Sequence, residues 1–250
     1  MSGLDDTALA RLVATTAGDI LLRLRASGLF EGKALGKAGD RTANAFIMEA
    51  LATQRPHDAV LSEEEKDNAA RLSASRVWIV DPLDGTREYG EGREDWAVHV
   101  ALAVDGRAVL GAVALPGLGV TLCTGGCPPA PAPAQTLRML VSRTRPAAEA
   151  VAVAEALGAE LVPMGSAGAK AMAVVRGEAD IYLHSGGQYE WDNAAPVAVA
   201  EAAGLHASRA DGSPLVYNCD NPYLPDLLIC DRALKDRVLE ALRAYQAKIG

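Results

Sequence analysis

The sequence predicts a layered α/β (α+β) sandwich built as two lobes. Its 250 residues are enough for one large domain or for two packed lobes. Residues 128–134 alternate Pro and Ala and cannot form a helix or a central strand, and beyond them helical and strand patterns alternate. We therefore expect an N-terminal α+β lobe over residues 1–127, a connector at 128–134, and a C-terminal α/β lobe over 135–250.

The N-terminal lobe opens with two helical patterns. Apolar residues recur at helical spacing over residues 5–27, and Gly28 ends this first pattern. We expect the glycines and lysines of residues 32–39 to form a loop. Asp40 is a good N-cap residue, so we expect the second helix to begin there.

Strands follow these two helices. Residues 77–80 are a compact apolar run bounded by turn residues, which is typical of a buried strand. Residues 96–104 and 108–115 are rich in strand-forming side chains, and the Asp-Gly pair at 105–106 between them is a strong hairpin signal.

The C-terminal lobe alternates between the two kinds of element. We expect its strands at residues 137–141, 181–183 and 227–230. We expect its helices at residues 147–157, 167–176, 192–203 and 233–247.

Composition excludes some function classes. Lys and Arg total 24 against 32 Asp and Glu, a net charge of −8, whereas a surface that tracks nucleic acid needs the opposite balance. We therefore expect no nucleic-acid partner. An acidic protein that handles an anion needs a local source of positive charge, either a few placed basic residues or bound metal ions.

The sequence shows neither a targeting signal nor a cysteine pattern that indicates a particular function. The start of the sequence carries acid where a signal peptide carries base, and no apolar run is long enough to span a bilayer, so we expect a cytoplasmic protein without a membrane partner. The four cysteines are too few and too scattered for a disulfide scaffold, and we interpret them as plain thiols. We expect the four histidines, which lie singly, to be structural: they are His57, His99, His184 and His206.

The most informative segment is Asp-Pro-Leu-Asp-Gly-Thr at residues 81–86, directly after the apolar strand. Ligands in α/β proteins commonly bind where strands end. Asp81 and Asp84 can converge on one hard cation such as magnesium, Gly85 allows a substrate to approach closely, and Thr86 supplies a hydroxyl. In isolation these residues would be read as an ordinary Asp-rich turn.

Three further segments occur in a matching order. Ser-Glu-Glu at residues 62–64 precedes the hexapeptide, Asp40 lies further upstream, and Glu-Trp-Asp-Asn-Ala-Ala covers residues 190–195. Taken singly, these acids would be interpreted as a solvated loop or as helix N-caps. With the hexapeptide, the set resembles the signatures of the inositol monophosphatase-like superfamily, the magnesium-dependent, lithium-sensitive phosphomonoesterases. The resemblance runs from the first helix to the last.

The resemblance implies a fold, a cofactor and a set of roles. The fold is that of inositol monophosphatase and fructose-1,6-bisphosphatase, and the cofactor is two or more Mg²⁺ ions per site, which clamp the attacking and leaving oxygens of an in-line displacement. The residues implied to position and deprotonate the attacking water are Asp40 and Thr86. The implied metal ligands are Glu63, Asp81, the Leu83 backbone carbonyl, Asp84 and Asp192.

Substrate choice is indicated by the residues after the hexapeptide. Arg-Glu-Tyr at 87–89 resembles the bacterial 3′(2′),5′-bisphosphate nucleotidases of sulfate assimilation. We expect hydrolysis of the 3′-phosphate of 3′-phosphoadenosine 5′-phosphate to AMP, with Arg143 or Lys170 binding the phosphate that is not cleaved. The expected substrate-binding residues are Gly85, Thr86, Ser142, Arg143, Ser166, Lys170 and Tyr189.

Alternatives stay open at this point. An inositol-phosphate or fructose-1,6-bisphosphate phosphatase of the same superfamily is one, although Ser185 stands where the inositol enzymes place a glutamate. Residues 184–188 also lack the arginine of many bisphosphate nucleotidases. A non-catalytic metal- or nucleotide-binding regulator should have lost a metal ligand or the Thr86 hydroxyl, and this sequence retains both. The sequence leaves a homodimer open.

Overall fold

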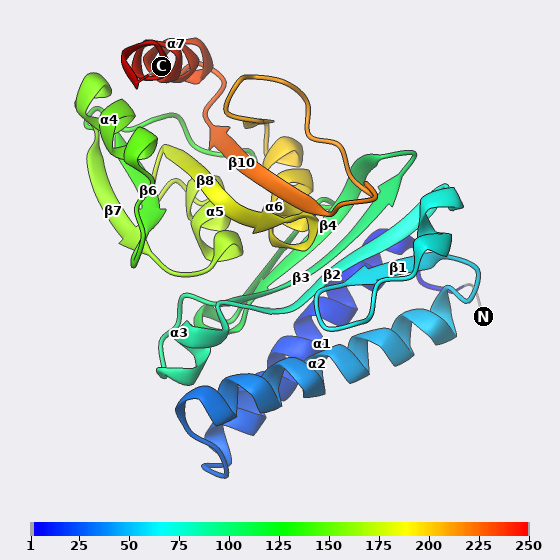
Figure 1. The fold of residues 1–250 in the computed structure, drawn as a ribbon. Helices are drawn as coiled ribbons and strands as arrows, with labels where there is room; N and C mark the ends of the chain where they lie inside the picture. The colour runs from blue at the N-terminus through cyan, green and yellow to red at the C-terminus, as the bar shows by residue number, and fades with distance from the viewer. Residues whose placement is uncertain (1–2, 250) are drawn as a thin grey trace.

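The computed structural model describes residues 3–249 and arranges them as five layers, helices alternating with two sheets (Figure 1). The strand order of the first sheet is β1-β2-β3-β4-β5. These strands are β1 (Ala59–Ser62), β2 (Arg76–Asp84), β3 (Ala97–Val104), β4 (Arg107–Leu115) and β5 (Val120–Cys123). Strand β1 runs parallel to β2 and every other pairing in this sheet is antiparallel. The Asp-Gly hairpin between β3 and β4 is confirmed, with both turn residues at positive φ.

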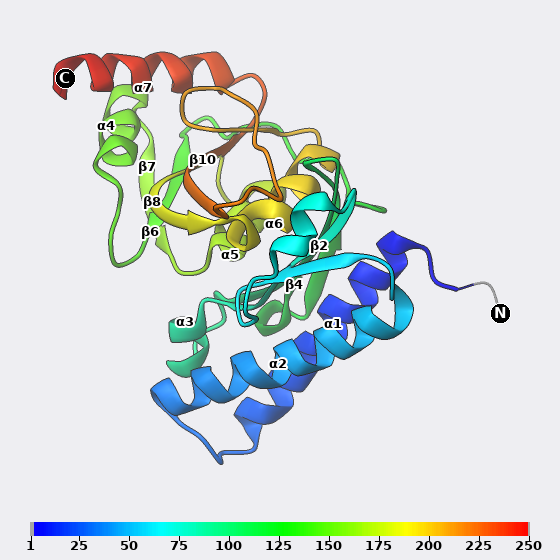
Figure 2. The same cartoon turned by 45° about the vertical axis from the view of Figure 1, so that its right-hand side comes forward.

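Two long helices cover the outer face of this sheet, as both ribbon views show (Figures 1 and 2). Helix α1 (Asp6–Ala26) matches its prediction, and the Asp5 side chain accepts a hydrogen bond from the Ala8 N–H at its start. Helix α2 spans Gly32–Gln54, so the predicted loop at residues 32–39 is wrong. Asp40 does not cap this helix but lies inside it, buried.

The glycines of this stretch serve close packing. A Cβ at Gly36 would lie 2.7 Å from Thr86 Cγ2, and one at Gly39 would lie 2.9 Å from the Tyr89 ring. Glycine weakens a helix by roughly 1 kcal/mol per residue, which is why a sequence pattern favours a loop here. Helix α2 tolerates that cost because the glycines let it approach α3 (Thr86–Gly90) closely enough to bring Asp40 to Thr86.

The second sheet has the strand order β7-β6-β8-β10-β9. These strands are β6 (Arg138–Ser142), β7 (Glu160–Met164), β8 (Ile181–Tyr189), β9 (His206–Ser208) and β10 (Tyr223–Cys230). Strand β8 runs six residues beyond the predicted 181–183, because β10 pairs with it as far as Tyr189. The outer face is covered by α4 (Ala148–Leu157) and α7 (Lys235–Ile249).

The middle layer consists of α5 (Ala167–Val175) and α6 (Glu190–Ala202), packed between the two sheets. Helix α6 begins two residues before the predicted position. Asp192 therefore is not its N-cap; it is the third helical residue and accepts a hydrogen bond from the Tyr189 N–H at 2.6 Å. This start points the carboxylate of Asp192 back toward the first sheet's strand ends.

The apolar core spans both sheets. One continuous cluster joins side chains of the first sheet, α5, α6 and the second sheet. Residues 128–134 lie outside any helix or strand, as predicted, whereas the division into two lobes at this point stays a prediction. All four cysteines are free thiols. None of the helices in residues 3–249 combines the length and apolar character needed to cross a bilayer.

Candidate metal centre

The pairing of β2 with β3 shifts register near the end of β2, and this shift brings the side chains of Asp81 and Asp84 close together. Asp81 pairs with His99 and Asp84 with Ala97, and the register shifts between the two pairs. Gly85 follows with φ of +88°, a left-handed conformation that favours glycine, and α3 begins at the next residue. The hexapeptide is therefore a sharp strand-to-helix turn in which two nearby aspartates need not alternate between the faces of the sheet.

Three predicted metal ligands meet at this turn. Asp81, Asp84 and Asp192 each offer a carboxylate oxygen, and these oxygens lie within 4.8 Å of one another. Asp81 and Asp84 are buried, with 1% and 7% of their surface exposed, and Asp192 is half-buried. The cluster joins the end of β2 in one sheet with the start of α6, which follows a strand of the other.

Asp84 is anchored by the N-terminus of α5. Its carboxylate accepts hydrogen bonds from Ser166 Oγ at 2.5 Å, from the Gly168 N–H at 2.6 Å and from the Ala167 N–H at 3.1 Å. His99 Nε2 lies 3.3 Å from the same carboxylate. Burial alone would raise the pKa of Asp84, but the neighbouring His99, through its charge and its contact, and the hydrogen bonds from Ser166 and Gly168 hold this pKa at about 2. Asp84 is therefore fixed in position and ionised.

The neighbouring carboxyls behave in the opposite way. Glu63 keeps an exposed surface and Asp192 is half-buried, but partial loss of hydration, reinforced by the neighbouring acids, raises the pKa of both to about 7. Burial and the Glu63 charge raise the pKa of Asp81 well above its ordinary value. The site thus gathers more carboxylates than the protein can ionise without a cation. Oxygen donors of this kind suit a hard divalent ion, so the residues present fit the metal that the sequence implies.

The remaining predicted ligands lie at the same turn. Glu63 follows β1, and its N–H donates to the Val80 carbonyl, which keeps it beside Asp81. The Leu83 carbonyl is 3.1 Å from Thr86 Oγ1, and the Leu83 N–H donates to Asp81 Oδ1. The parallel pairing of β1 with β2 explains why Glu63 reaches Asp81, which lies eighteen residues further along the chain.

Asp40 and Thr86, the predicted catalytic pair, are in contact. Thr86 Oγ1 lies 3.1 Å from Asp40 Oδ2. The other oxygen, Asp40 Oδ1, is buried and has no hydrogen-bond partner within residues 3–249. Burial raises the pKa of Asp40 to about 7. A carboxyl with one oxygen held by a threonine and the other free can accept a proton from a bound water.

Beside the carboxylates is a polar cavity of about 410 Å³. It brings together four of the predicted substrate-binding residues, which the chain spreads over two segments: Ser142, Arg143, Ser166 and Lys170. Arg87 and Arg145 also line it. Three guanidiniums and one ammonium line the cavity against the single carboxylate of Glu88, so the cavity is a local cationic site that the overall charge of −8 does not reveal.

Two of these cations already have partners. Arg143 forms ion pairs with Glu88 at 2.8 Å and with Glu91 at 2.9 Å. Lys170 is buried and donates to the carbonyls of Gly165 and Ser166, which uses two of its three protons. Lys170 thereby holds the backbone that presents Ser166 to Asp84, and its Nζ also lies 5.2 Å from the centre of the Tyr182 ring.

Comparison with known proteins agrees with this geometry. Residues 7–247 match the model of the Inositol monophosphatase family. This chain belongs to that family.

Two curated relatives of this chain are named for the hydrolysis of nucleotide bisphosphates. It is 50% identical over 261 residues to the "3′-phosphoadenosine 5′-phosphate phosphatase" of Mycobacterium leprae, covering 96% of this chain and 94% of the relative. It is 32% identical over 199 residues to the "3′(2′),5′-bisphosphate nucleotidase CysQ" of Escherichia coli K12, covering 75% of this chain and 81% of the relative. The fold agrees with the crystal structure of CysQ from Bacteroides thetaiotaomicron, with a TM-score of 0.79, 25% identity, and 91% and 97% of the two chains covered.

Tyr189 lies apart from the cationic cavity. Its ring stacks on Trp191, with centroids 4.8 Å apart and planes 6° from parallel, and it meets the Tyr223 ring edge-on at 5.7 Å. Tyr189 and Tyr223 are each 40% exposed and pair across β8 and β10. This aromatic corner adjoins Asp192, so in this inositol monophosphatase family member Tyr189 borders the carboxylates from the side of the second sheet.

Sequence reasoning missed two residues of the centre. His99 was expected to be structural; its Nδ1 lies 3.0 Å from the Trp191 carbonyl and its Nε2 beside Asp84, so it joins the two signature segments. His99 lies in an apolar strand and belongs to no recognised motif, so the sequence alone does not indicate this role. Arg145 lies in the segment after β6, where the pattern showed only the preceding Ser-Arg pair.

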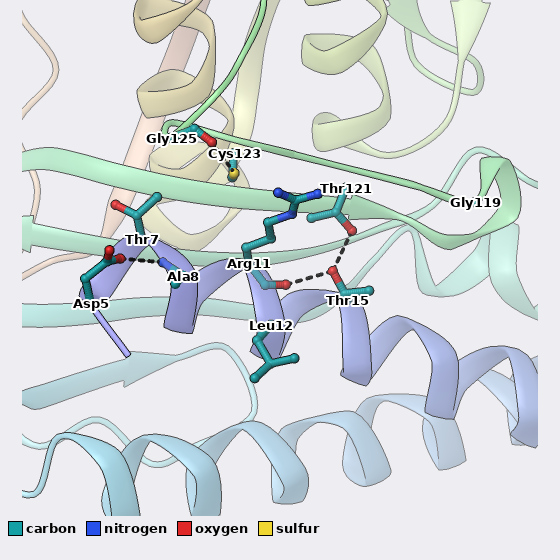
Figure 3. A pocket seen from close by; sticks show the side chains of 10 residues that line it. All are labelled: Asp5, Thr7, Ala8, Arg11, Leu12, Thr15, Gly119, Thr121, Cys123 and Gly125. Atoms are coloured by element: carbon teal, nitrogen blue, oxygen red, sulfur yellow. Dashed lines mark hydrogen bonds between the residues drawn. The ribbon is translucent and has the colours of Figure 1, made fainter. Parts of the chain in front are cut away.

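Another cavity, of about 750 Å³, lies between α1 and β5 (Figure 3). Thr15 Oγ1 and Thr121 Oγ1 are 2.8 Å apart across it, and Arg11 extends over it. Asp5, its acidic residue, caps α1. This cavity therefore contains no group of carboxylates like the one at the end of β2.

Proposed function

We propose that this chain is a magnesium-dependent phosphomonoesterase that hydrolyses the 3′-phosphate of 3′-phosphoadenosine 5′-phosphate, giving AMP and phosphate in the cytoplasm. The main support for this proposal is that a cluster of carboxylates lies beside a cavity lined by cations. A carboxylate cluster that fits divalent cations adjoins a cavity lined by three arginines and a lysine, and Ser166 links them because it lines the cavity and donates to Asp84. A substrate with one phosphate to cleave and another to keep needs both features.

The residues proposed to hold the ions are Glu63, Asp81, the Leu83 carbonyl, Asp84 and Asp192. When bound, such ions supply Lewis-acid stabilisation of the phosphate charge and acidify a water molecule. The α5 N-terminus keeps Asp84 ionised, so this ligand is available before any cation arrives. Because the pKa values of Glu63 and Asp192 are raised, we expect cation binding to release protons.

Asp40 and Thr86 are proposed to act on the attacking water. Thr86 Oγ1 can accept from that water while donating its own proton to Asp40 Oδ2 or to the Leu83 carbonyl. Asp40 Oδ1, which is free, is placed to take the proton that the water gives up. Both residues lie on rigid elements, since α2 and α3 pack in direct contact at Gly36.

The spectator 5′-phosphate is proposed to bind in the cationic cavity. Arg143 is the first candidate, because its guanidinium is fixed by Glu88, which is 7% exposed, and retains donors beyond those two bonds. Ser142 and Lys170 line the same cavity, and Gly85, which lies against Ser166, is proposed to let the substrate approach closely. Tyr189 is proposed to contact the adenine from the aromatic corner, where nucleobase stacking contributes about 1–3 kcal/mol.

A phosphate-release panel tests the substrate. With Mg²⁺ present, 3′-phosphoadenosine 5′-phosphate should give a higher kcat/KM than inositol 1-phosphate and fructose 1,6-bisphosphate. Arg143→Ala should raise KM for the bisphosphate about ten- to a hundred-fold, since a charge-assisted hydrogen bond is worth roughly 1.5–3 kcal/mol. A faster wild-type reaction on inositol 1-phosphate would overturn the substrate, and equal losses on both substrates would exclude Arg143 as the discriminating residue.

A further inference from the structure

A third cavity, of about 540 Å³, lies between α3 and the first half of α2, on the opposite side of α3 from the cationic cavity. Asp40 and Thr86 form part of its wall. Arg87 lines both this cavity and the cationic cavity described above. Helix α3 therefore separates two openings, and the proposed catalytic pair faces the one beside α2.

The α2 side of this cavity carries positive charge. Lys33 and Lys37 are exposed and four residues apart, so they form one stripe on the helix that continues to Asp40. Within residues 3–249, neither lysine takes part in an ion pair, and Arg87 takes part in none either. In a protein of net charge −8, three unpaired cations around one cavity form a local basic site.

The cavity also has acidic residues, and they do not cancel these cations. Glu91 is engaged by Arg143 at 2.9 Å from the other side of α3. Asp40 is buried at the inner end, beside Thr86. Glu64 is then the one remaining carboxylate of the lining that faces Lys33, Lys37 and Arg87.

The geometry of in-line displacement indicates which reaction product reaches the cavity between α2 and α3. In an in-line displacement the water attacks from the side opposite the leaving group, and the transferred phosphoryl group moves toward the water. The catalytic pair faces the α2 cavity, so the nucleotide product must leave on the other side. We propose that Lys33, Lys37 and Arg87 form a binding site for the inorganic phosphate product and its route of exit. This inference rests on the proposed function.

The packing of α2 supports the assignment. A Cβ at Gly36 would lie 2.7 Å from Thr86 Cγ2, so the helix is pressed against α3 between the two lysines. Lys33 and Lys37 are held next to the cavity by a rigid contact instead of by a loop. A phosphate that leaves the carboxylates on the Thr86 side therefore meets these side chains first.

The test separates the two products. Phosphate and AMP are used as product inhibitors of the metal-loaded enzyme, and phosphate binding is also measured by calorimetry without turnover. Lys33→Gln and Lys37→Gln should each raise the phosphate inhibition constant about two- to fivefold, as expected for losing an exposed ion pair, and the double variant about tenfold. The AMP inhibition constant should change less than twofold. Arg41→Gln removes an exposed charge of α2 outside the cavity lining and is the matched control.

Two results would overturn the proposal. One is an unchanged phosphate constant in the double variant, by inhibition and by calorimetry. The other is an equal rise for AMP and phosphate, which would make the lysines part of nucleotide binding or of the overall field. Failure of the proposed function is distinguishable, because calorimetry reports phosphate binding even if no bisphosphate is hydrolysed.

Discussion

Replacement of Asp84 by asparagine separates its contact with the start of α5 from its proposed role in binding a cation. Its lowered pKa, about 2 against 3.8, corresponds to roughly 2 kcal/mol of stabilisation of the folded protein at neutral pH. Asparagine keeps one acceptor oxygen but turns an NH₂ toward a backbone N–H, leaving a buried donor without a partner at about 1–3 kcal/mol. Relief of repulsion with Asp81 and Asp192 offsets part of this loss, so we expect a net destabilisation of about 1–2 kcal/mol in EDTA.

Urea unfolding measured in EDTA and in Mg²⁺ checks this expectation. Wild-type protein should gain about 2.7 kcal/mol at a Mg²⁺ concentration a hundredfold above Kd, whereas Asp84→Asn should gain much less and lose phosphatase activity. Glu49→Gln removes one negative charge from an exposed position of α2 and is the control. The reasoning fails if Asp84→Asn matches wild type in EDTA and gains the same stability from Mg²⁺.

Three further changes test other parts of the structure. Gly168→Ala would place a Cβ 2.0 Å from His99 Nε2, so we expect a loss of roughly 1–3 kcal/mol in urea unfolding; wild-type stability would contradict this packing. The pKa values of Glu63 and Asp192 are raised to about 7, above their unfolded values, so the metal-free protein should lose stability as pH rises from 4 to 7. Mg²⁺ should therefore raise Tm more at pH 8 than at pH 5.5. A rise in Tm that does not depend on pH would refute this. Asp58 is half-buried, and its hydrogen bonds to an arginine and a tryptophan lower its pKa. Asp58→Asn should therefore cost roughly 1–2 kcal/mol at pH 7, and the deficit should shrink as pH falls below 4; a constant deficit would contradict it.

The parts of the fold that sequence predicts are those with a strong local pattern. The apolar run before Asp81, the Asp-Gly hairpin and the Pro–Ala connector each have one physical interpretation. The order of the acidic motifs also predicts that Asp81, Asp84 and Asp192 meet, because a cluster of carboxylates around a metal accounts for all of them. Local chemistry and motif order therefore predict the cluster of three carboxylates that the structure shows.

The parts that sequence does not predict depend on contacts between distant elements. Gly36 weakens a helix locally, and only the position of Thr86 explains why α2 continues through it. His99 contacts Asp84 because the β2–β3 register brings them to one strand end. Arg145 shares a cavity with Arg87 through the packing of two sheets. Such pairs leave no periodic signal in one sequence.

Crystals soaked in Mn²⁺ and examined by anomalous diffraction test the central claim, that the carboxylates at the end of β2 hold the ions for phosphate hydrolysis. Mn²⁺ takes the oxygen ligands that suit Mg²⁺. The account predicts one anomalous peak among Asp81, Asp84 and Asp192, and a second between Asp81 and Glu63 that includes the Leu83 carbonyl. Peaks confined to other acidic surfaces, with none at Asp81, would contradict it.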